Sequence, residues 1–399
     1  MRSPAASPFQ LGLFWLGIQM VWGALLAISL QARTSALDGA AALVHYGEIA
    51  TAGAIVAAVT QIVVGPIADA RRARGDRRII FYAGGALAAA GGIWWFYAAA
   101  NFAELVAAFM LVQCAMNVAI GPYQSVIPDF VEARRTGVAS SWMAGLQSLG
   151  NAAGAVTASF VTSGRAVAGV LIALLLATCA ATARHVRTLD VQPVQSERLS
   201  ITKAFVDLFV SRALIYVGFY TLLGYLYFYV SDVMAATPGA VKSTSGVLLL
   251  LFTAVGAAGA AASARATDRA DKRLIVTASG GAFVAGLAGF LAAHGLTAIY
   301  AATLLAGAAW GAFPTADWAL GCALLPRAAL ATGMGVWNLA IIFPQIIAPA
   351  GTTFALYALH ATSAGKAPAV AFGLAAIEVL AGVAWTWRLP SSKGGWNAV

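Results

Sequence analysis

The sequence predicts an all-α polytopic membrane protein with twelve transmembrane helices in two six-helix halves. Of its 399 residues, 61% are hydrophobic and only 10% are charged, whereas a soluble domain carries about 25% charged residues. A helix that spans a bilayer needs roughly 20 mostly apolar residues, and twelve such runs follow one another along the chain. The 41 glycines also suit close packing of helices within lipid. This composition excludes a soluble enzyme, a DNA-binding protein and a disulfide-rich secreted domain.

The apolar runs are predicted to be helices because they are long and lack the period-two alternation of a strand. In the first half they span 10–31, 42–67, 79–100, 103–129, 138–162 and 167–183. In the second half they span 210–234, 243–264, 274–293, 296–321, 333–357 and 369–388. The polar segment 184–207 is therefore expected to be a cytoplasmic linker between an N-terminal six-helix bundle, 1–183, and a C-terminal six-helix bundle, 208–399.

The Lys and Arg residues indicate the orientation, because cytoplasmic loops are enriched in them. With the N-terminus inside, only four of the 24 basic residues fall on the opposite side, namely Arg33, Arg165, Lys242 and Lys366. We therefore expect a protein of the cytoplasmic (inner) membrane with both termini in the cytoplasm. The net charge of +9 comes from these loops and does not indicate a nucleic-acid partner.

No metal, cofactor or enzymatic chemistry is expected. Cys114, Cys179 and Cys322 each lie in an apolar run without metal-ligand spacing, and the four histidines are scattered. The sequence contains no P-loop and no HExxH motif.

Two pairs of segments indicate an internal duplication. The loop after the second run reads Asp69-Ala-Arg-Arg-Ala-Arg-Gly-Asp-Arg-Arg, and the loop after the eighth run is similar, with Asp268-Arg-Ala-Asp-Lys-Arg. In the same way, Thr136-Gly137 before the fifth run matches Thr332-Gly333 before the eleventh. Duplicated halves are typical of secondary transporters, whose substrate site lies near the bilayer midplane between the repeats. A functional monomer is the expected state.

The first of these loops is predicted to form a conformational latch. A carboxylate with several arginines can hold neighbouring helix ends together on the inner side and release them in another state, and Gly65 would allow close packing. The alternative is an ordinary basic loop. The predicted latch comprises Gly65, Asp69, Arg74, Arg77, Arg78, Asp129, Arg134 and Arg135. The loop resembles the G-x-x-x-D-R-x-G-R-R signature of the major facilitator superfamily, with Ala70 in place of the first Arg.

Three further stretches carry a more specific resemblance. They are Gly17-Ile-Gln19-Met-Val-Trp22, Gln61-Ile-Val-Val-Gly65, and Gly121-Pro-Tyr-Gln-Ser-Val-Ile-Pro-Asp129. These resemble motifs of plant sucrose–proton symporters, and Ala316-Asp317-Trp318, Trp337-Asn338 and Pro344-Gln345 look like bacterial relatives of that group. The chain thus resembles the glycoside–pentoside–hexuronide:cation symporter group near the sucrose symporters. This resemblance implies the major facilitator fold and proton-coupled uptake of a sugar.

One departure from that group concerns proton coupling. The resembled symporters carry an Asp eight residues before the Gly-Pro pair and an Arg three residues after its Gly. Here these positions are Gln113 and Gln124, neutral amides that cannot carry a proton. Coupling must therefore use another carboxylate, or it is absent.

Three carboxylates are coupling candidates, because an acid within hydrocarbon is costly and is a functional hypothesis by default. They are Glu48 in the outer third of the second helix, Asp317 near the inner end of the tenth, and Glu378 in the middle of the twelfth. A buried carboxyl could be protonated outside and release its proton inside. For Glu378 the alternative is a protonated acid hydrogen-bonded to a neighbouring helix.

Neutral amides and aromatic rings are expected to bind the substrate, because amides bond hydroxyl groups and rings stack on sugar faces. Gln113, Asn117 and Gln124 are spaced by four and seven residues and so share one helix face. The predicted substrate-binding residues are Gln19, Trp22, Gln113, Asn117, Gln124, Gln147, Asn151, Asp317, Trp318 and Asn338. Further candidates are Tyr220, Tyr225, Tyr227, Tyr229, Trp310 and Gln345.

These features predict a secondary active transporter that works by alternating access. It takes up a neutral sugar or glycoside, and the uptake is coupled to a cation, namely the proton. Its partners would be the small-molecule substrate, the coupling proton and the lipid bilayer. The alternatives are an exporter of drugs or metabolites and an uncoupled facilitator, both on the same fold.

Overall fold

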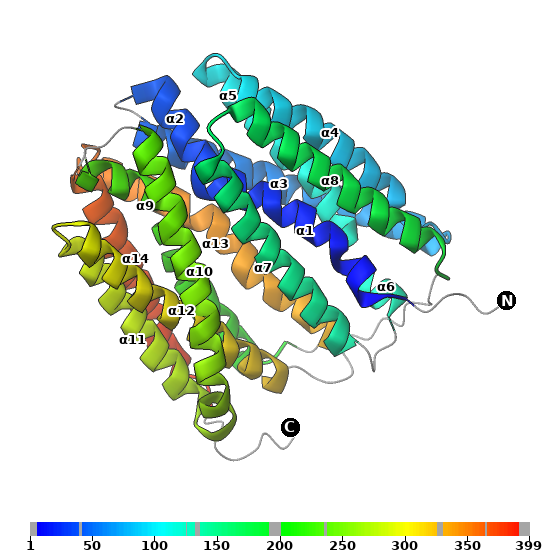
Figure 1. Cartoon of the computed structure of the whole chain (residues 1–399). Coiled ribbons are helices and arrows are strands. Elements are labelled where there is room, and N and C mark those ends of the chain that lie inside the picture. The colour runs from blue at the N-terminus through cyan, green and yellow to red at the C-terminus, as the bar shows by residue number, and fades with distance from the viewer. Residues whose placement is uncertain are drawn as a thin grey trace. The chain divides into compact units, whose positions relative to one another are not determined.

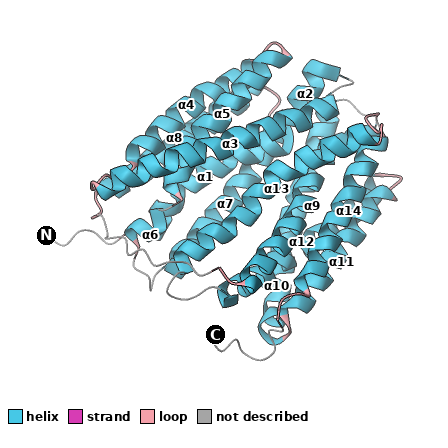
Figure 2. Ribbon diagram, turned by 180° about the vertical axis from the view of Figure 1, so that it is seen from behind, coloured by secondary structure: helices cyan, strands magenta, loops and turns pink. Residues whose placement is uncertain are grey.

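The structure is a computed structural model that describes residues 6–39, 42–124, 126–131, 136–190, 201–234, 238–324, 330–363 and 365–390. Within these ranges every regular element is a helix (Figure 2). The chain divides into two compact units, Met1–Gln195 and Ser196–Val399 (Figure 1). Each unit contains six long helices among its described residues.

The first unit begins with α1 (Pro8–Ala24), which continues through a π-helical turn, η1 (Leu25–Ser29), into α2 (Leu30–Asp38). The remaining helices of this unit are α3 (Ala42–Ala73), α4 (Ile79–Ala98), α5 (Phe102–Tyr123), the short α6 (Val126–Phe130), α7 (Thr136–Phe160) and α8 (Gly164–Arg187). Helix α1 packs against α7 and α8, and α5 packs against α3 and α4 (Figure 1).

Small residues let the backbones of α1 and α7 approach closely. A Cβ atom at Gly154 would overlap the backbone oxygen of Met20, and one at Gly150 would overlap that of Leu16. Helix pairs in lipid gain stability from such close packing, because apolar side chains gain nothing by leaving lipid. The glycine content of the sequence thus serves this helix pair directly.

The second unit consists of α9 (Lys203–Met234), α10 (Pro238–Arg269), α11 (Lys272–Leu291), α12 (Leu296–Leu324), α13 (Leu330–Ala358) and α14 (Lys366–Thr386). Helix α9 packs against α13 and α14, and α12 packs against α10 and α11. Gly256 of α10 and Gly311 of α12 bring their backbones together. A Cβ atom at Gly311 would overlap the backbone oxygen of Gly256 and force these two helices apart.

Among the described residues, eleven helical segments are long and apolar enough to cross a membrane. Helix α7 is not among them, because Gln147, Ser148 and Asn151 near its middle lower its hydropathy. Each of the twelve predicted runs corresponds to one long helical segment, counting α1, η1 and α2 as one.

The helix boundaries differ from the prediction at several places. The prediction of a single helix over 103–129 is wrong at the C-terminal end, because α5 stops at Tyr123 and a separate short helix, α6, covers Val126–Phe130. Pro122 and Pro128 remove backbone donors there. At the unit boundary, α8 continues to Arg187 and α9 already begins at Lys203, so helix ends occupy part of the 184–207 segment.

Candidate functional site

A cluster of three neutral amides joins α3 and α5 in the first unit. Gln61 Nε2 donates a hydrogen bond of 2.7 Å to Asn117 Oδ1. Asn117 Nδ2 donates in turn to the backbone oxygen of Gln113 at 2.8 Å and lies 3.5 Å from Gln113 Oε1. Gln113 and Asn117 are buried, whereas Gln61 is half-buried. We call Gln61, Gln113 and Asn117 the amide cluster.

The local sequence explains why the amide cluster forms. Gln113 and Asn117 are one helical turn apart on α5, so their side chains meet on one face. A Cβ atom at Gly53 of α3 would lie 3.1 Å from Gln113 Nε2, so this glycine leaves room for the amide. Carboxamides present both donors and acceptors. The cluster therefore matches hydroxyl groups, which also donate and accept.

The other predicted substrate residues of the first unit lie outside this cluster. Gln19 and Trp22 are half-buried on α1, and Gln147 is half-buried on α7. Gln124 forms the C-cap of α5 with an exposed side chain, and Asn151 is exposed on α7. The structure thus brings together Gln113 and Asn117 and adds Gln61. This residue begins the Gln61-Ile-Val-Val-Gly65 motif but was not predicted to bind the substrate.

A buried ion pair dominates the charged interior of the second unit. Arg212 of α9 pairs with Asp317 of α12, and their side chains are only 3% and 2% exposed. The guanidinium carbon lies 3.5 Å from the centroid of the Trp337 ring on α13 and 4.9 Å from that of Tyr216. Trp337 packs on Gly321, where a Cβ atom would lie 2.9 Å from the ring.

This arrangement gives Asp317 a partner that the sequence analysis missed. The count of basic residues placed Arg212 on the cytoplasmic side, whereas it lies nine residues inside α9. Its position within the apolar stretch Phe209–Ile215 was the available signal. The side chains of Trp318 and Asn338, two predicted substrate residues, lie outside the described part of the structure.

Aromatic rings surround this region of α9. Phe219 stacks on Trp310 of α12 with centroids 3.8 Å apart and an interplanar angle of 4°. Tyr216 meets the same Trp310 ring edge-on at 5.1 Å. The Tyr220 hydroxyl accepts a hydrogen bond of 3.1 Å from Gln345 Nε2 of α13. Such rings are mutually stabilising and offer apolar faces beside polar groups.

Glu378 lies near the middle of α14 and is half-buried. It accepts a hydrogen bond of 3.3 Å from Thr221 Oγ1 of α9. Thr221 Oγ1 is also 3.4 Å from Thr352 Oγ1 of α13, and both threonines are 0% exposed. A short chain of polar groups thus connects three helices.

Glu48 has a different environment. It lies on α3 six residues after the start of that helix, and its side chain is 50% exposed. His45 Nε2 lies 3.9 Å from Glu48 Oε2, and His45 Nδ1 contacts Asp38. Glu48 is thus exposed and lies beside the half-buried His45, which in turn contacts the half-buried Asp38, at one end of α3.

Part of the predicted latch is assembled in the first unit. Arg78 Nη1 lies 2.8 Å from Asp129 Oδ2, with side chains 6% and 5% exposed. Arg78 is the N-cap of α4 and has a φ of +60°. Its backbone N–H donates to Asp76 Oδ1 at 2.7 Å, and Arg71 Nε donates to Asp76 Oδ2 at 2.8 Å. Burial favours the neutral acid, but these hydrogen bonds and the neighbouring arginines outweigh it and lower the pKa of Asp76.

The remaining latch residues contribute differently. A Cβ atom at Gly65 meets no described atom within 4 Å, and the nearby Ile62 and Val63 are exposed, so the described part of the structure shows no close packing at this glycine. Arg74 is exposed. Arg134, Arg135 and the side chain of Asp69 lie outside the described residues.

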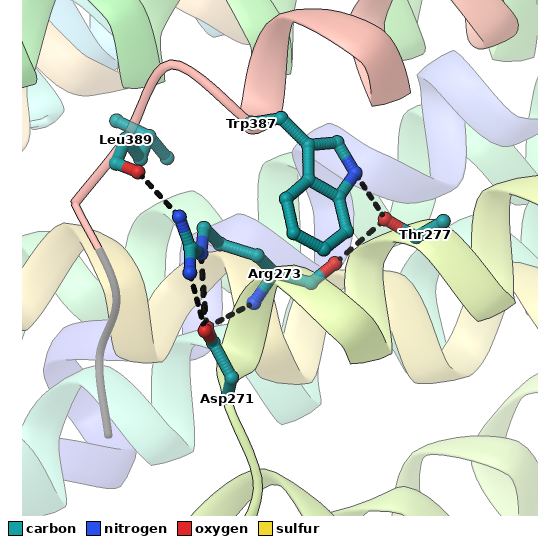
Figure 3. Close-up of polar contacts among 5 residues, drawn as sticks. All are labelled: Asp271, Arg273, Thr277, Trp387 and Leu389. Carbon is teal, nitrogen blue, oxygen red and sulfur yellow. Dashed lines mark hydrogen bonds and ion pairs between the residues drawn. The ribbon is translucent and has the colours of Figure 1, made fainter.

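Each unit contains a similar contact between an arginine side chain and a backbone oxygen. Arg77, just before α4, donates from Nε to the backbone oxygen of Leu189 at 3.0 Å. Arg273, at the start of α11, donates from Nη1 to the backbone oxygen of Leu389 at 2.8 Å (Figure 3). Leu189 and Leu389 follow the last helix of their respective units, α8 and α14. Each unit therefore ties the beginning of its third long helix to the end of its sixth.

The second of these contacts is reinforced by its neighbours. Asp271 pairs with Arg273 at 2.7 Å and also accepts from its backbone N–H at 3.1 Å. Trp387 lies beside the Arg273 guanidinium, with the guanidinium carbon 5.1 Å from the ring centroid, and donates from Nε1 to Thr277 Oγ1 at 3.1 Å (Figure 3). No group of three His, Cys, Asp or Glu residues suited to a metal ion occurs among the described residues.

The family model described as Major Facilitator Superfamily matches residues 9–349. A comparison with curated proteins gives no significant match. Among solved structures, a bacterial homolog of the human lysosomal transporter Spinster, inward-facing and occupied, has a TM-score of 0.69 and 13% identity, covering 96% of this chain and 97% of its own.

Two further solved structures show the same likeness. The nucleoside transporter NupG has a TM-score of 0.69 and 14% identity, covering 96% of this chain and 99% of its own. A bacterial metal transporter has a TM-score of 0.57 and 12% identity, covering 96% of this chain and 97% of its own. At these identities the likeness shows the fold. It confirms the predicted fold class, an all-α polytopic membrane protein with twelve transmembrane helices in two six-helix halves.

Proposed function

Because the chain belongs to the major facilitator superfamily, we propose that it is a secondary active transporter that takes up a neutral sugar or glycoside together with a proton. It works by alternating access, as a monomer in the cytoplasmic membrane, with both termini in the cytoplasm. The resemblance to the sucrose–proton symporters supports the substrate class, and the excess of Lys and Arg in alternate loops supports the orientation.

The observation that carries the substrate class is the amide cluster. Three carboxamides are linked by hydrogen bonds inside a helical unit, and Gln113 and Asn117 at its centre are buried. Polar groups within a membrane bundle are retained for function, because each is costly in hydrocarbon. A charged substrate would need an opposite charge, whereas the cluster offers neutral donors and acceptors that suit hydroxyl groups.

The Arg78–Asp129 pair supports the latch. The pair is buried and joins the start of α4 to α6. A pair of this kind stabilises the state in which it forms and costs free energy when it opens. In the proposed cycle it biases one of the two access states, and transport requires it to open and close again.

The test is uptake by proteoliposomes of radiolabelled sucrose, maltose and uridine, with and without an inward proton gradient. Uridine is included because NupG is described as a nucleoside transporter. We expect accumulation of a sugar that depends on the gradient. Equilibration without accumulation would indicate a facilitator, and outward movement alone would indicate an exporter. Either result would overturn proton-coupled uptake.

Substitutions in the amide cluster test the substrate site. Gln113→Met and Asn117→Leu keep the side-chain volume and remove the amide, and each is expected to lower kcat/KM for the sugar about tenfold. Gln10→Met removes the same chemistry at an exposed position on α1 and should leave transport unchanged. Equal rates for all three variants would contradict the role of the cluster.

A further inference from the structure

We propose that Glu378 is the proton-binding site of this protein and that Thr221 and Thr352 form a reversible hydroxyl relay for it. The role in coupling rests on the proposed function, whereas proton binding itself does not. The site lies wholly within the second unit, where α9, α13 and α14 meet.

The three groups form a chain that Thr221 joins at its centre. Thr221 Oγ1 stands between the other two, 3.3 Å from Glu378 Oε2 and 3.4 Å from Thr352 Oγ1. Both threonines are fully buried and come from different helices. The carboxyl group therefore has polar neighbours that are shielded from solvent and fixed by the packing of the helices.

Within the described part of the structure, the helices packed against α14 place no compensating charge close to Glu378. Thr221 is nine residues from Arg212 and eleven from Asp232, or about 13 Å and 16 Å along α9. The other charged groups are Lys203 and Asp207 at the start of α9, Lys272 and Arg273 at the start of α11, and Lys366 at the start of α14. Helix α13 has no charged residue, and its only titratable group is Tyr357 near its end.

Tyr225 lies one turn from Thr221 on α9, and its hydroxyl is 3.4 Å from Thr353 Oγ1. It is a neutral phenol at physiological pH and cannot balance a carboxylate. When a carboxyl group has no cation nearby, gain or loss of a proton changes the local charge by a full unit. The protonation state of such a group can therefore respond to the proton gradient.

The pair of threonine hydroxyl groups suits both protonation states of Glu378. When Glu378 is ionised, Thr352 donates to Thr221 Oγ1, and Thr221 donates to the carboxylate. When Glu378 is protonated, its own O–H donates to Thr221 Oγ1, and Thr221 donates to Thr352 Oγ1. Each hydroxyl group can donate and accept, so the chain reverses when a proton is added to Glu378 and the two threonine O–H bonds rotate. No helix has to move for the proton to bind or leave.

The other two carboxylate candidates are less suited to this task. Protonation of Asp317 would leave the buried Arg212 charge without its partner, which is strongly unfavourable. Glu48 is half exposed, so its proton would exchange with the solution whatever the state of the transporter. Of the three, Glu378 combines burial, hydroxyl partners and the lack of a nearby cation.

The test of proton binding is infrared spectroscopy of the purified full-length protein in detergent across a range of pH. The C=O band of a protonated carboxylic acid is followed in the wild type and in Glu378→Gln. We expect a titrating component in the wild type that is missing from the variant. Thr221→Val removes a hydrogen bond to the ionised form and should raise the midpoint by about one pH unit.

A matched control is available on α13. Thr353 is the neighbour of Thr352 but contacts Tyr225, so Thr353→Val should leave the midpoint unchanged. If Glu378→Gln does not fold, Glu378→Asp keeps the acid on a shorter side chain and should shift the same component. A titrating band that is identical in the wild type, Glu378→Gln and Thr221→Val would overturn the site.

Transport measurements separate this proposal from the proposed function. If both hold, Glu378→Gln should lose gradient-driven accumulation of the sugar and keep exchange of labelled for unlabelled sugar. If the infrared component is lost in Glu378→Gln but no sugar moves in the wild type, the proton site stands and the proposed function fails. If Glu378→Gln accumulates sugar as the wild type does, the role of Glu378 in coupling is overturned and the proposed function stands.

Discussion

Arg273 Nη1 donates a hydrogen bond of 2.8 Å to the backbone oxygen of Leu389 and so ties the start of α11 to the segment after α14. The first unit repeats this contact between Arg77 and Leu189 at 3.0 Å. The duplicated loops read from the sequence therefore have a shared structural role. Each loop supplies an arginine that satisfies a backbone oxygen just beyond the last helix of its unit, where carbonyl groups lack helical partners.

Removal of the Arg273 side chain should destabilise the second unit. Arg273→Ala loses the bond to Leu389 and leaves Asp271, which is 4% exposed, without this partner. We expect the free energy of unfolding to fall by about 1–3 kcal/mol, seen as a lower Tm in detergent. Arg74→Ala removes the same charge from an exposed position and should leave Tm unchanged. A similar Tm for both variants would contradict a stabilising role for the contacts of Arg273 with Leu389 and Asp271.

The Arg78–Asp129 pair should show strong coupling. Because both side chains are buried, Arg78→Gln and Asp129→Asn each leave the other buried charge without this partner and should cost about 3–5 kcal/mol. The double variant should cost much less than the two together, as a double-mutant cycle of unfolding free energies measures. Additive costs would show that the two groups do not stabilise each other.

The Arg212–Asp317 pair should tolerate removal of both charges together. Arg212→Met or Asp317→Leu alone leaves one buried charge and should lower stability by about 3–5 kcal/mol. In the double variant, Met can still pack on the Trp337 ring, and no charge remains, so most of the stability should return. The measurement is thermal unfolding. Gradient-driven uptake that persists in the double variant would also show that Asp317 does not carry the coupled proton.

The contact between α1 and α7 should depend on Gly154. A Cβ atom at this position would overlap the backbone oxygen of Met20, so Gly154→Ala should lower stability by about 1–3 kcal/mol. Gly145 lies on the same helix, and a Cβ atom there meets no described atom within 4 Å. Gly145→Ala should be neutral or slightly stabilising. Unfolding of both variants in detergent gives a direct comparison, and equal Tm values would contradict the close approach.

The sequence was sufficient for the number and order of the long helices, because apolar runs of bilayer length are set by local composition. It also placed Gln113 and Asn117 on one face of α5, since helical spacing is local. It could not pair Gln61 with Asn117 or Thr221 with Glu378, because those contacts depend on how separate helices rotate against each other. Arg212 was missed for a different reason. A count of charges by loop treats a basic residue near a helix end as cytoplasmic, although here it turns inward to Asp317.

The π-helical turn between α1 and α2 has a consequence for the register of the first transmembrane segment. An α-helix advances about 100° per residue, and a π-helical turn accommodates one residue more than an α-helical turn. Gln31 and Arg33 follow η1, whereas Gln19 and Trp22 precede it. Relative to Gln19 and Trp22, the later pair is therefore rotated about the helix axis by about 100° compared with an unbroken α-helix. Deletion of one residue from Leu25–Ser29 would undo the rotation, and the two ends of this segment would then face different neighbours within the unit.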